Sequence, residues 1–222
     1  VRFISDLESI PISKVLDCYS FPETSIDYKA ETFIDRETIE ESTGTLPEEF
    51  KPIVGNPSDL MGQLALNYMI SRRFDLPKIL GACIGYCDSG LYSGRIIIPY
   101  FFKGRIVFYS GRSFMGAEPK YYNCSKSEFG LLSDVTYNLE ACDWYEEINL
   151  MEGVFDALTL GDNSCAISGL KPSSVAIDYI MQSNVKRINV IADKGFYNAA
   201  KKTARIFFNE KLVSVLNFDN LH

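Results

Sequence analysis

Three acidic residues in the C-terminal half of the chain have the types and spacing of a metal site. Glu152 closes the apolar run Ile148-Asn-Leu-Met151, Asp193 closes Arg187-Ile-Asn-Val-Ile-Ala192, and a helix-type pattern follows each run. Parallel strands place such residues at one sheet edge, where ligands bind, and Asp156 lies one helical turn after Glu152. Converging carboxylates repel each other unless a cation lies among them, and oxygen ligands suit Mg²⁺. The alternative is that the acids cap helices and face water.

The composition is that of an ordinary globular protein. Of its 222 residues 46% are hydrophobic, enough to bury a core in one or two domains. No apolar run is long enough to span a bilayer, and the first residues lack the regions of a signal peptide. We therefore expect a cytoplasmic protein without membrane contact. The chain begins with Val1 instead of Met, so we expect a fragment.

The six cysteines are scattered, and Cys83 and Cys87 form their one close pair. A zinc site on this pair would need distant cysteines, because the single histidine is the last residue, His222, and zinc sites usually show two close pairs. Reduced thiols are the preferred interpretation.

The net charge of −7 is distributed unevenly. Residues 1–56 carry 12 acidic and 5 basic side chains, so we expect them to avoid nucleic acid and to pack on the core or contact a protein partner. Residues 95–126 contain six basic residues and a single acidic residue, Glu118. A local basic stripe can bind phosphates even on an acidic protein. The six are Arg95, Lys103, Arg105, Arg112, Lys120 and Lys126, of which we interpret Lys103, Arg105 and Lys126 as solvated.

The first two thirds of the chain predict a small α+β unit. A helix is expected over 58–73 with Ser58 as its N-cap and Leu60, Leu64, Tyr68 and Met69 at helical spacing. A short helix follows from Pro77, then a strand near 84–86. Residues 93–112 predict a β-hairpin that turns at Lys103-Gly104. Weaker patterns suggest a helix over 7–19 and a strand over 26–34.

The segment Glu118-Pro-Lys-Tyr-Tyr-Asn123 predicts a loop with a lysine beside two tyrosines. Lys120 and a nearby arginine could hold a phosphate while Tyr121 stacks on a base. The alternative is that Tyr121 and Tyr122 are half-buried core residues.

From residue 148 onward strands and helices alternate, which predicts a parallel sheet. Strands are expected at 148–152, 164–168, 188–191 and 212–216, with helices at 173–182 and 198–210. The predicted division of the chain is an acidic segment (1–56), a basic α+β subdomain (57–143) and an α/β domain (144–222) whose mostly parallel sheet is flanked by helices.

At this point the residues resemble a known family. Met151-Glu-Gly-Val-Phe-Asp-Ala-Leu158, Gly169 and Ile191-Ala-Asp193 with Ala199-Ala200 are similar to the Toprim domain. Four upstream motifs narrow the resemblance to the catalytic core of DnaG-like DNA primases, in a short form more similar to bacteriophage primases. These motifs are Tyr68 with Arg72, Gly94-Arg-Ile-Ile-Ile-Pro99, Gly111-Arg112 and Pro119-Lys-Tyr-Tyr-Asn123.

The resemblance covers residues 45–219 and implies RNA primer synthesis on single-stranded DNA in the bacterial or phage-infected cytoplasm. Its substrates would be ribonucleoside triphosphates, its cofactor Mg²⁺ or Mn²⁺, and a replicative helicase its candidate partner. The residues that it implies are Glu152 and Asp193 for catalysis, Glu152, Asp156, Asp193 and Asp219 for metal binding, and Arg95, Arg112, Lys120 and Tyr121 for nucleotide or template binding.

The sequence departs from the family pattern in two respects. Lys194-Gly195 follows Asp193, so one acid of the D-x-D motif is absent unless Asp219 replaces it. The family's zinc-binding and helicase-binding modules have no counterpart. Two rival functions therefore stay open: a Toprim nuclease, which would not need the upstream motifs, and a non-catalytic nucleic-acid-binding Toprim subunit, which would tolerate the missing acid.

Overall fold

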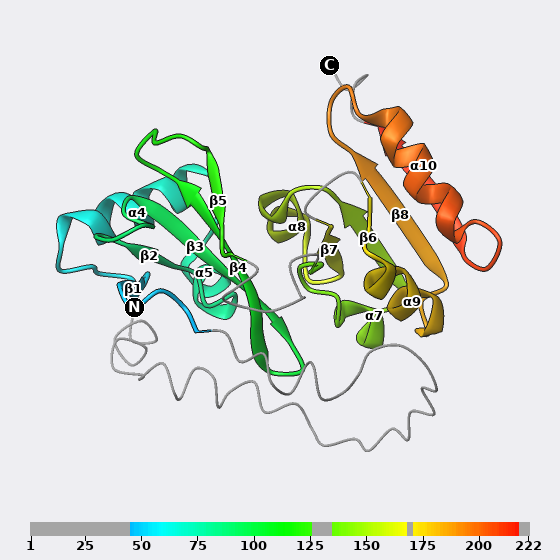
Figure 1. Cartoon of the computed structure of the whole chain (residues 1–222), viewed down its shortest axis with the longest axis horizontal. Coiled ribbons are helices and arrows are strands. Elements are labelled where there is room, and N and C mark those ends of the chain that lie inside the picture. The colour runs from blue at the N-terminus through cyan, green and yellow to red at the C-terminus, as the bar shows by residue number, and fades with distance from the viewer. Residues whose placement is uncertain (1–44, 126–134, 168–170, 218–222) are drawn as a thin grey trace. The chain divides into compact units, whose positions relative to one another are not determined.

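The computed structural model describes residues 45–125, 135–167 and 171–217 (Figure 1). The predicted helix at 7–19, the predicted strand at 26–34 and Asp219 lie outside these residues. The described chain forms two compact units. The first holds residues 45–99 and 104–125, and the second holds residues 100–103 and 135–217, without the undescribed 168–170. The three-part division at 56 and 143 stays a prediction.

A five-stranded sheet with strand order β1-β2-β3-β4-β5 and two helices make up the first unit (Figure 1). Its strands are β1 (Phe50–Pro52), β2 (Gly85–Cys87), β3 (Arg95–Phe102), β4 (Arg105–Ser113) and β5 (Tyr121–Asn123), and its helices are α4 (Leu60–Ser71) and α5 (Leu76–Gly81). The predicted hairpin is confirmed, since β3 and β4 are neighbours joined at Lys103-Gly104. Both turn residues have positive φ, +51° and +72°, as a tight two-residue hairpin turn requires.

The N-cap of helix α4 lies one residue later than predicted. Asp59, not Ser58, is the N-cap: one carboxylate oxygen accepts the Gly62 N–H at 2.8 Å and the other accepts the Tyr86 hydroxyl at 2.6 Å. Of the four residues expected at helical spacing, Met69 is buried but Leu60 is 69% exposed, and the buried face also includes Gly62 and Ala65.

Gly62 allows α4 to pack closely on the sheet. A Cβ at this position would lie 2.7 Å from the Tyr86 hydroxyl oxygen, so a residue without a side chain is needed where the helix meets β2.

The second unit is an α/β domain whose four-stranded sheet is parallel throughout, with strand order β7-β6-β8-β9. The predicted alternation of strands and helices is thereby confirmed. Its strands are β6 (Glu147–Met151), β7 (Ser164–Ala166), β8 (Arg187–Ala192) and β9 (Leu212–Asn217), and its helices are α7 (Ala141–Trp144), α8 (Val154–Leu160), α9 (Ser174–Gln182) and α10 (Tyr197–Phe207).

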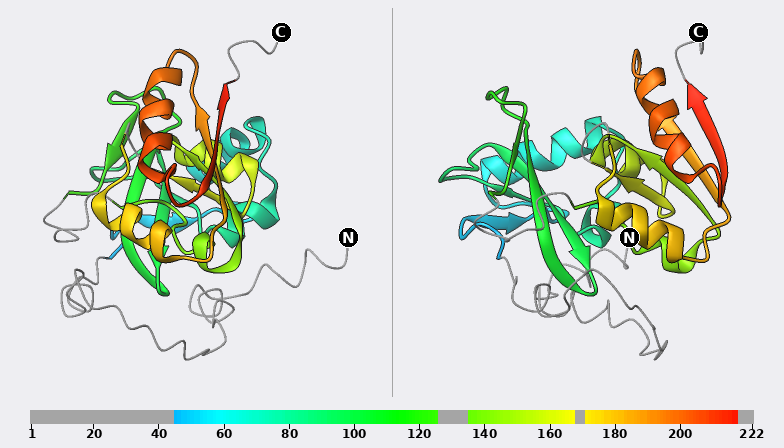
Figure 2. Two further views of the ribbon diagram at one scale, coloured as in Figure 1. Left: turned by 90° about the vertical axis from the view of Figure 1, so that its right-hand side faces the viewer. Right: turned by 45° about the vertical axis from the view of Figure 1, so that its right-hand side comes forward.

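Helices pack on the sheet through apolar and small side chains. Helix α10 lies along β8 and β9, as the turned views show, and buries Ala200, Ala204 and Phe207 (Figure 2). Helix α8 packs on β6 and β7. Among the described residues, no helix has the length and apolar character needed to cross a membrane.

A row of polar side chains crosses the whole sheet. Ser164, Asn149, Asn189 and Ser214 are direct neighbours on β7, β6, β8 and β9. The Asn149 amide donates to Ser164 Oγ and accepts from the Asn189 amide, both at 3.2 Å. Because strand residues alternate between faces, this row lies opposite the apolar face of Leu150 and Val190. A one-residue slip would put amides among apolar side chains, so the row fixes the register.

Removing the centre of this row should destabilise the second unit. We expect Asn149→Ala to lower the free energy of unfolding by about 1–3 kcal/mol, because it leaves partly buried partners without their hydrogen bonds. The measurement is urea denaturation followed by circular dichroism. Asn198→Ala, an exposed position on α10, is the matched control and should stay within about 0.5 kcal/mol of the parent. Equal stability of the two variants would contradict a role for the row.

Candidate functional site

Two acids lie at the carboxyl ends of neighbouring strands. Strands β6 and β8 pair in parallel, with Leu150 opposite Val190. Glu152 follows the end of β6, and Asp193 follows the end of β8 directly. This is the edge at which ligands bind in parallel α/β sheets.

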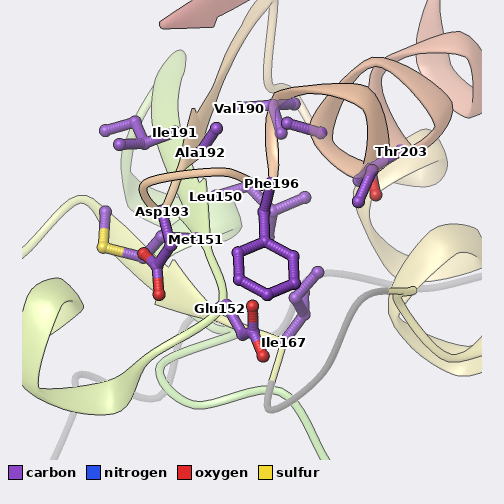
Figure 3. A pocket seen from close by; sticks show the side chains of 12 residues that line it. Leu150, Met151, Glu152, Ile167, Val190, Ile191, Ala192, Asp193, Phe196 and Thr203 are labelled. Carbon is purple, nitrogen blue, oxygen red and sulfur yellow. The ribbon is translucent and has the colours of Figure 1, made fainter. Parts of the chain in front are cut away.

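Both acids line one pocket (Figure 3). Its floor is apolar and comes from the ends of β6 and β8 and from the first turns of α10. The lining residues are Leu150, Met151, Glu152, Ile167, Val190, Ile191, Ala192, Asp193, Phe196, Ala199, Ala200 and Thr203. The two carboxylates beside an apolar lining make this small pocket the candidate ligand site of the second unit.

The surroundings of Glu152 in this pocket disfavour its ionised form. Burial raises the pKa of Glu152 above its ordinary value, and the nearby charges of Asp193 and Asp156 raise it further. Asp156 lies in the first turn of α8. A Cβ on Gly153 would come within 2.3 Å of an Asp156 carboxylate oxygen, so glycine leaves room for that carboxylate. The φ of Gly153 is an ordinary −93°.

The carboxylates suit a cation that needs few protein ligands. Within the described ranges, no three histidine, cysteine, aspartate or glutamate side chains are grouped to hold a metal ion. Mg²⁺, however, is commonly bound by one or two carboxylates and completes its shell with water and substrate phosphates. Glu152 and Asp193 fit that donor set. The assignment of Glu152, Asp156, Asp193 and Asp219 as ligands stays a prediction.

Phe196 also lines the pocket but was not among the residues predicted for the site. Its side chain is 47% exposed, and its backbone N–H donates to the Asp193 carbonyl oxygen at 2.9 Å. The signal was available: an aromatic residue three positions after a strand-end acid. The motifs that predict the site at this sheet edge are defined by their acids, so they do not include this aromatic residue.

In the first unit, two residues of the predicted binding set are adjacent, the half-buried Arg112 and the more exposed Tyr121. Arg112 and Tyr121 are direct partners on β4 and β5, and the Arg112 guanidinium carbon lies 4.8 Å from the centre of the Tyr121 ring. Tyr121 is 36% exposed. Arg112 lies within β4, and β5 is a strand where a loop was predicted. Lys120 precedes β5 and is exposed.

Arg95 occupies a different environment from Arg112. It is only 5% exposed and donates to the Pro119 carbonyl oxygen at 2.8 Å. Its guanidinium carbon also lies 5.6 Å from the centre of the Tyr122 ring. These contacts hold the segment that leads into β5, so the side chain supports the sheet. Its predicted contact with nucleotide or template stays a prediction.

Two further motif residues are neighbours. The Arg72 guanidinium carbon lies 5.9 Å from the centre of the Tyr68 ring, and that ring lies 6.2 Å from the ring of Phe114. The described part of the first unit thus carries three pairs of an arginine against a tyrosine: Arg72 with Tyr68, Arg95 with Tyr122 and Arg112 with Tyr121.

A comparison with protein-family models finds no match, and neither does a comparison with curated proteins. Solved structures, however, share the fold. A DnaG catalytic core matches with a TM-score of 0.61 and 14% identity over 74% of this chain and 67% of that chain. A DnaG primase catalytic domain bound to single-stranded DNA matches with 0.60 and 16% over 72% and 66%. The E. coli primase catalytic core matches with 0.61 and 15% over 74% and 68%.

The predicted resemblance is therefore confirmed at the level of the fold, an α/β arrangement like that of DnaG primase catalytic cores. The chain spans about two thirds of the length of those structures.

Neutralising Glu152 should stabilise the protein. Because its pKa is raised in the folded state, the folded state holds the Glu152 proton more tightly than the unfolded state, and stability falls as pH rises through the raised pKa. We expect Glu152→Gln to raise the free energy of unfolding at neutral pH by less than about 1 kcal/mol, since the group is partly solvated. The gain should vanish well below the ordinary pKa of 4.5, where the carboxyl is protonated in both states.

The same variant tests Mg²⁺ binding. Mg²⁺ should raise the thermal midpoint of the parent by mass action and leave that of Glu152→Gln unchanged. Glu210→Gln removes an exposed acid beyond α10 and should respond to Mg²⁺ like the parent. Identical Mg²⁺ responses in all three proteins would remove Glu152 from the ligand set.

Proposed function

We propose that this chain synthesises RNA primers on single-stranded DNA from ribonucleoside triphosphates. The observation that carries the proposal is the pair Glu152 and Asp193 at the carboxyl edge of β6 and β8, in one pocket of a fold like that of primase catalytic cores. Burial raises the Glu152 pKa, and the neighbouring charges of Asp193 and Asp156 raise it further, so a cation bound beside these carboxylates would be favoured.

Primer extension requires a 3′-hydroxyl to attack an α-phosphate in line while pyrophosphate leaves. The chemistry consists mainly of positioning and charge stabilisation. A bound Mg²⁺ or Mn²⁺ would supply positive charge at the reacting oxygens. In the proposal Glu152 and Asp193 hold that ion through their carboxylates, with Asp156 adding negative charge nearby and Asp219 as a further candidate ligand.

Arg112, Lys120 and Tyr121 are proposed to bind nucleotide phosphates or template. A guanidinium can hold a phosphate with two parallel hydrogen bonds. The partly exposed ring of Tyr121 offers a stacking face beside it. Arg95 contributes in this proposal by holding the segment before β5 through its bond to Pro119. A replicative helicase stays a candidate partner.

One feature favours a second candidate, a non-catalytic nucleic-acid-binding subunit. Lys194 and Gly195 follow Asp193, so no second acid stands beside it. Such a protein would keep the arginine–tyrosine pairs of the first unit and bind single-stranded DNA without changing it.

Primer synthesis is tested directly with labelled ribonucleotides, single-stranded DNA and Mg²⁺ or Mn²⁺, with products separated by length. We expect the parent and Glu210→Gln to make primers. Glu152→Gln should lose activity by at least about 100-fold, the upper end of the loss seen even for residues behind the metal ligands. Shortening of labelled DNA would indicate a nuclease. Binding without any product from the parent would favour the non-catalytic subunit.

Binding by the first unit is tested by measuring single-stranded DNA affinity against salt. We expect Arg112→Ala to weaken binding and to lower the slope of log K against log salt by about 0.7, the contribution of one phosphate contact. Arg105→Ala, at the opposite end of β4, is the matched control and should leave the slope unchanged. Arg95→Ala should instead lower the thermal midpoint, because its side chain is buried. Equal slopes for the Arg112 and Arg105 variants would remove Arg112 from the interface.

A further inference from the structure

We propose that Phe196 is the stacking surface for the nucleobase of a ribonucleoside triphosphate held at the acid pocket. This inference rests on the proposed function and assigns a position to its substrate. The Phe196 ring lines the same pocket as the carboxylates of Glu152 and Asp193, and 47% of the side chain is exposed (Figure 3). An aromatic face beside oxygen ligands matches the two ends of a metal-bound nucleotide.

The Phe196 backbone is fixed relative to the acid. Its N–H donates to the Asp193 carbonyl oxygen at 2.9 Å, which closes the turn after β8. Its own carbonyl oxygen accepts the N–H groups of Ala199 and Ala200 at 3.0 and 3.1 Å, which starts α10. Gly195, with a φ of +82°, permits this turn. The backbone that carries the ring is therefore held beside Asp193, and little backbone ordering is needed when a ligand stacks on the ring.

The charges of the pocket select the class of ligand. Asp193 and Glu152 line it, and Asp156 lies in the first turn of α8, the helix that follows Glu152. A bare phosphodiester strand would be repelled by these acids. A ribonucleoside triphosphate arrives with Mg²⁺ on its phosphates, and its ribose hydroxyls can donate to a carboxylate. The ligand is thus a metal-bound mononucleotide and not the template strand.

A second exposed phenylalanine shows what distinguishes Phe196. Phe208 follows the other end of α10 and is 71% exposed, yet it is not among the residues that line the pocket. Single exposed apolar residues are common on protein surfaces and need no function. Phe196 differs because its exposed surface belongs to the wall of an acid-bearing pocket.

The test measures the affinity of the full chain for 2-aminopurine ribonucleoside triphosphate with Mg²⁺, using the fluorescence quenching that stacking produces. Mg²⁺-tripolyphosphate serves as a second probe that lacks base and sugar. We expect Phe196→Leu, which keeps an apolar cover on the pocket floor, to weaken nucleotide binding roughly 10-fold, the effect of losing one stacked base. Phe196→Trp should retain affinity, and Phe208→Leu should match the parent. Binding of tripolyphosphate should be the same in all four proteins.

The outcomes separate this inference from the proposed function. Unchanged nucleotide binding in Phe196→Leu would overturn the stacking role and leave the acid site intact. Equal losses for nucleotide and tripolyphosphate would also overturn it, since Phe196 would then act by shaping the carboxylates. If the parent binds neither probe while folding normally, the acid site itself fails, and the inference fails with it.

Discussion

The parallel pairing of β6 with β8 is the constraint on which the candidate site depends. It brings the ends of two strands together, and each strand is followed by an acid, Glu152 or Asp193. Burial of Glu152 and the nearby charges of Asp193 and Asp156 raise its pKa, and the ionised carboxylate therefore opposes folding. Two features hold the strands in place despite it: buried apolar residues such as Leu150 and Val190 on one face, and the amide row of Asn149 and Asn189 on the other. The site is strained locally and stabilised by the sheet beneath it.

The two arginines on the central strands of the first unit lie in different environments. Arg95 and Arg112 lie on β3 and β4, and each guanidinium lies near a tyrosine of β5. Arg95, however, is buried and donates its hydrogen bonds to main-chain carbonyl oxygens. A buried charge that is well hydrogen-bonded is costly to remove, because its partners are left unsatisfied. The basic stripe of the sequence is therefore part scaffold and part accessible surface.

The sequence predicted what depends on local pattern and missed what depends on tertiary contacts. Strand–helix alternation after residue 148 and the Lys103-Gly104 turn are local signals, and both sheets contain the elements they predicted. The strand at Tyr121–Asn123 has three residues and exists through its pairing with β4. Asp59 caps α4 instead of Ser58 because Tyr86, distant in sequence, bonds its second oxygen. The burial of Arg95 likewise depends on the Pro119 carbonyl oxygen, which no periodicity in the sequence reveals.

With so few acids in the pocket, binding of a metal ion and binding of a nucleotide are expected to depend on each other. An ion held by one or two carboxylates must complete its shell with water or with ligand oxygens. A triphosphate supplies such oxygens, so the ion and the nucleotide each improve the binding of the other, and the coupling is reciprocal. Affinity for free Mg²⁺ is then low, while affinity for the metal-bound nucleotide gains from any contact with its base. In this pocket the exposed Phe196 is the aromatic side chain that can make such a contact. Under the proposed function, a site with few acids would depend more on contacts with the base and sugar of its nucleotide.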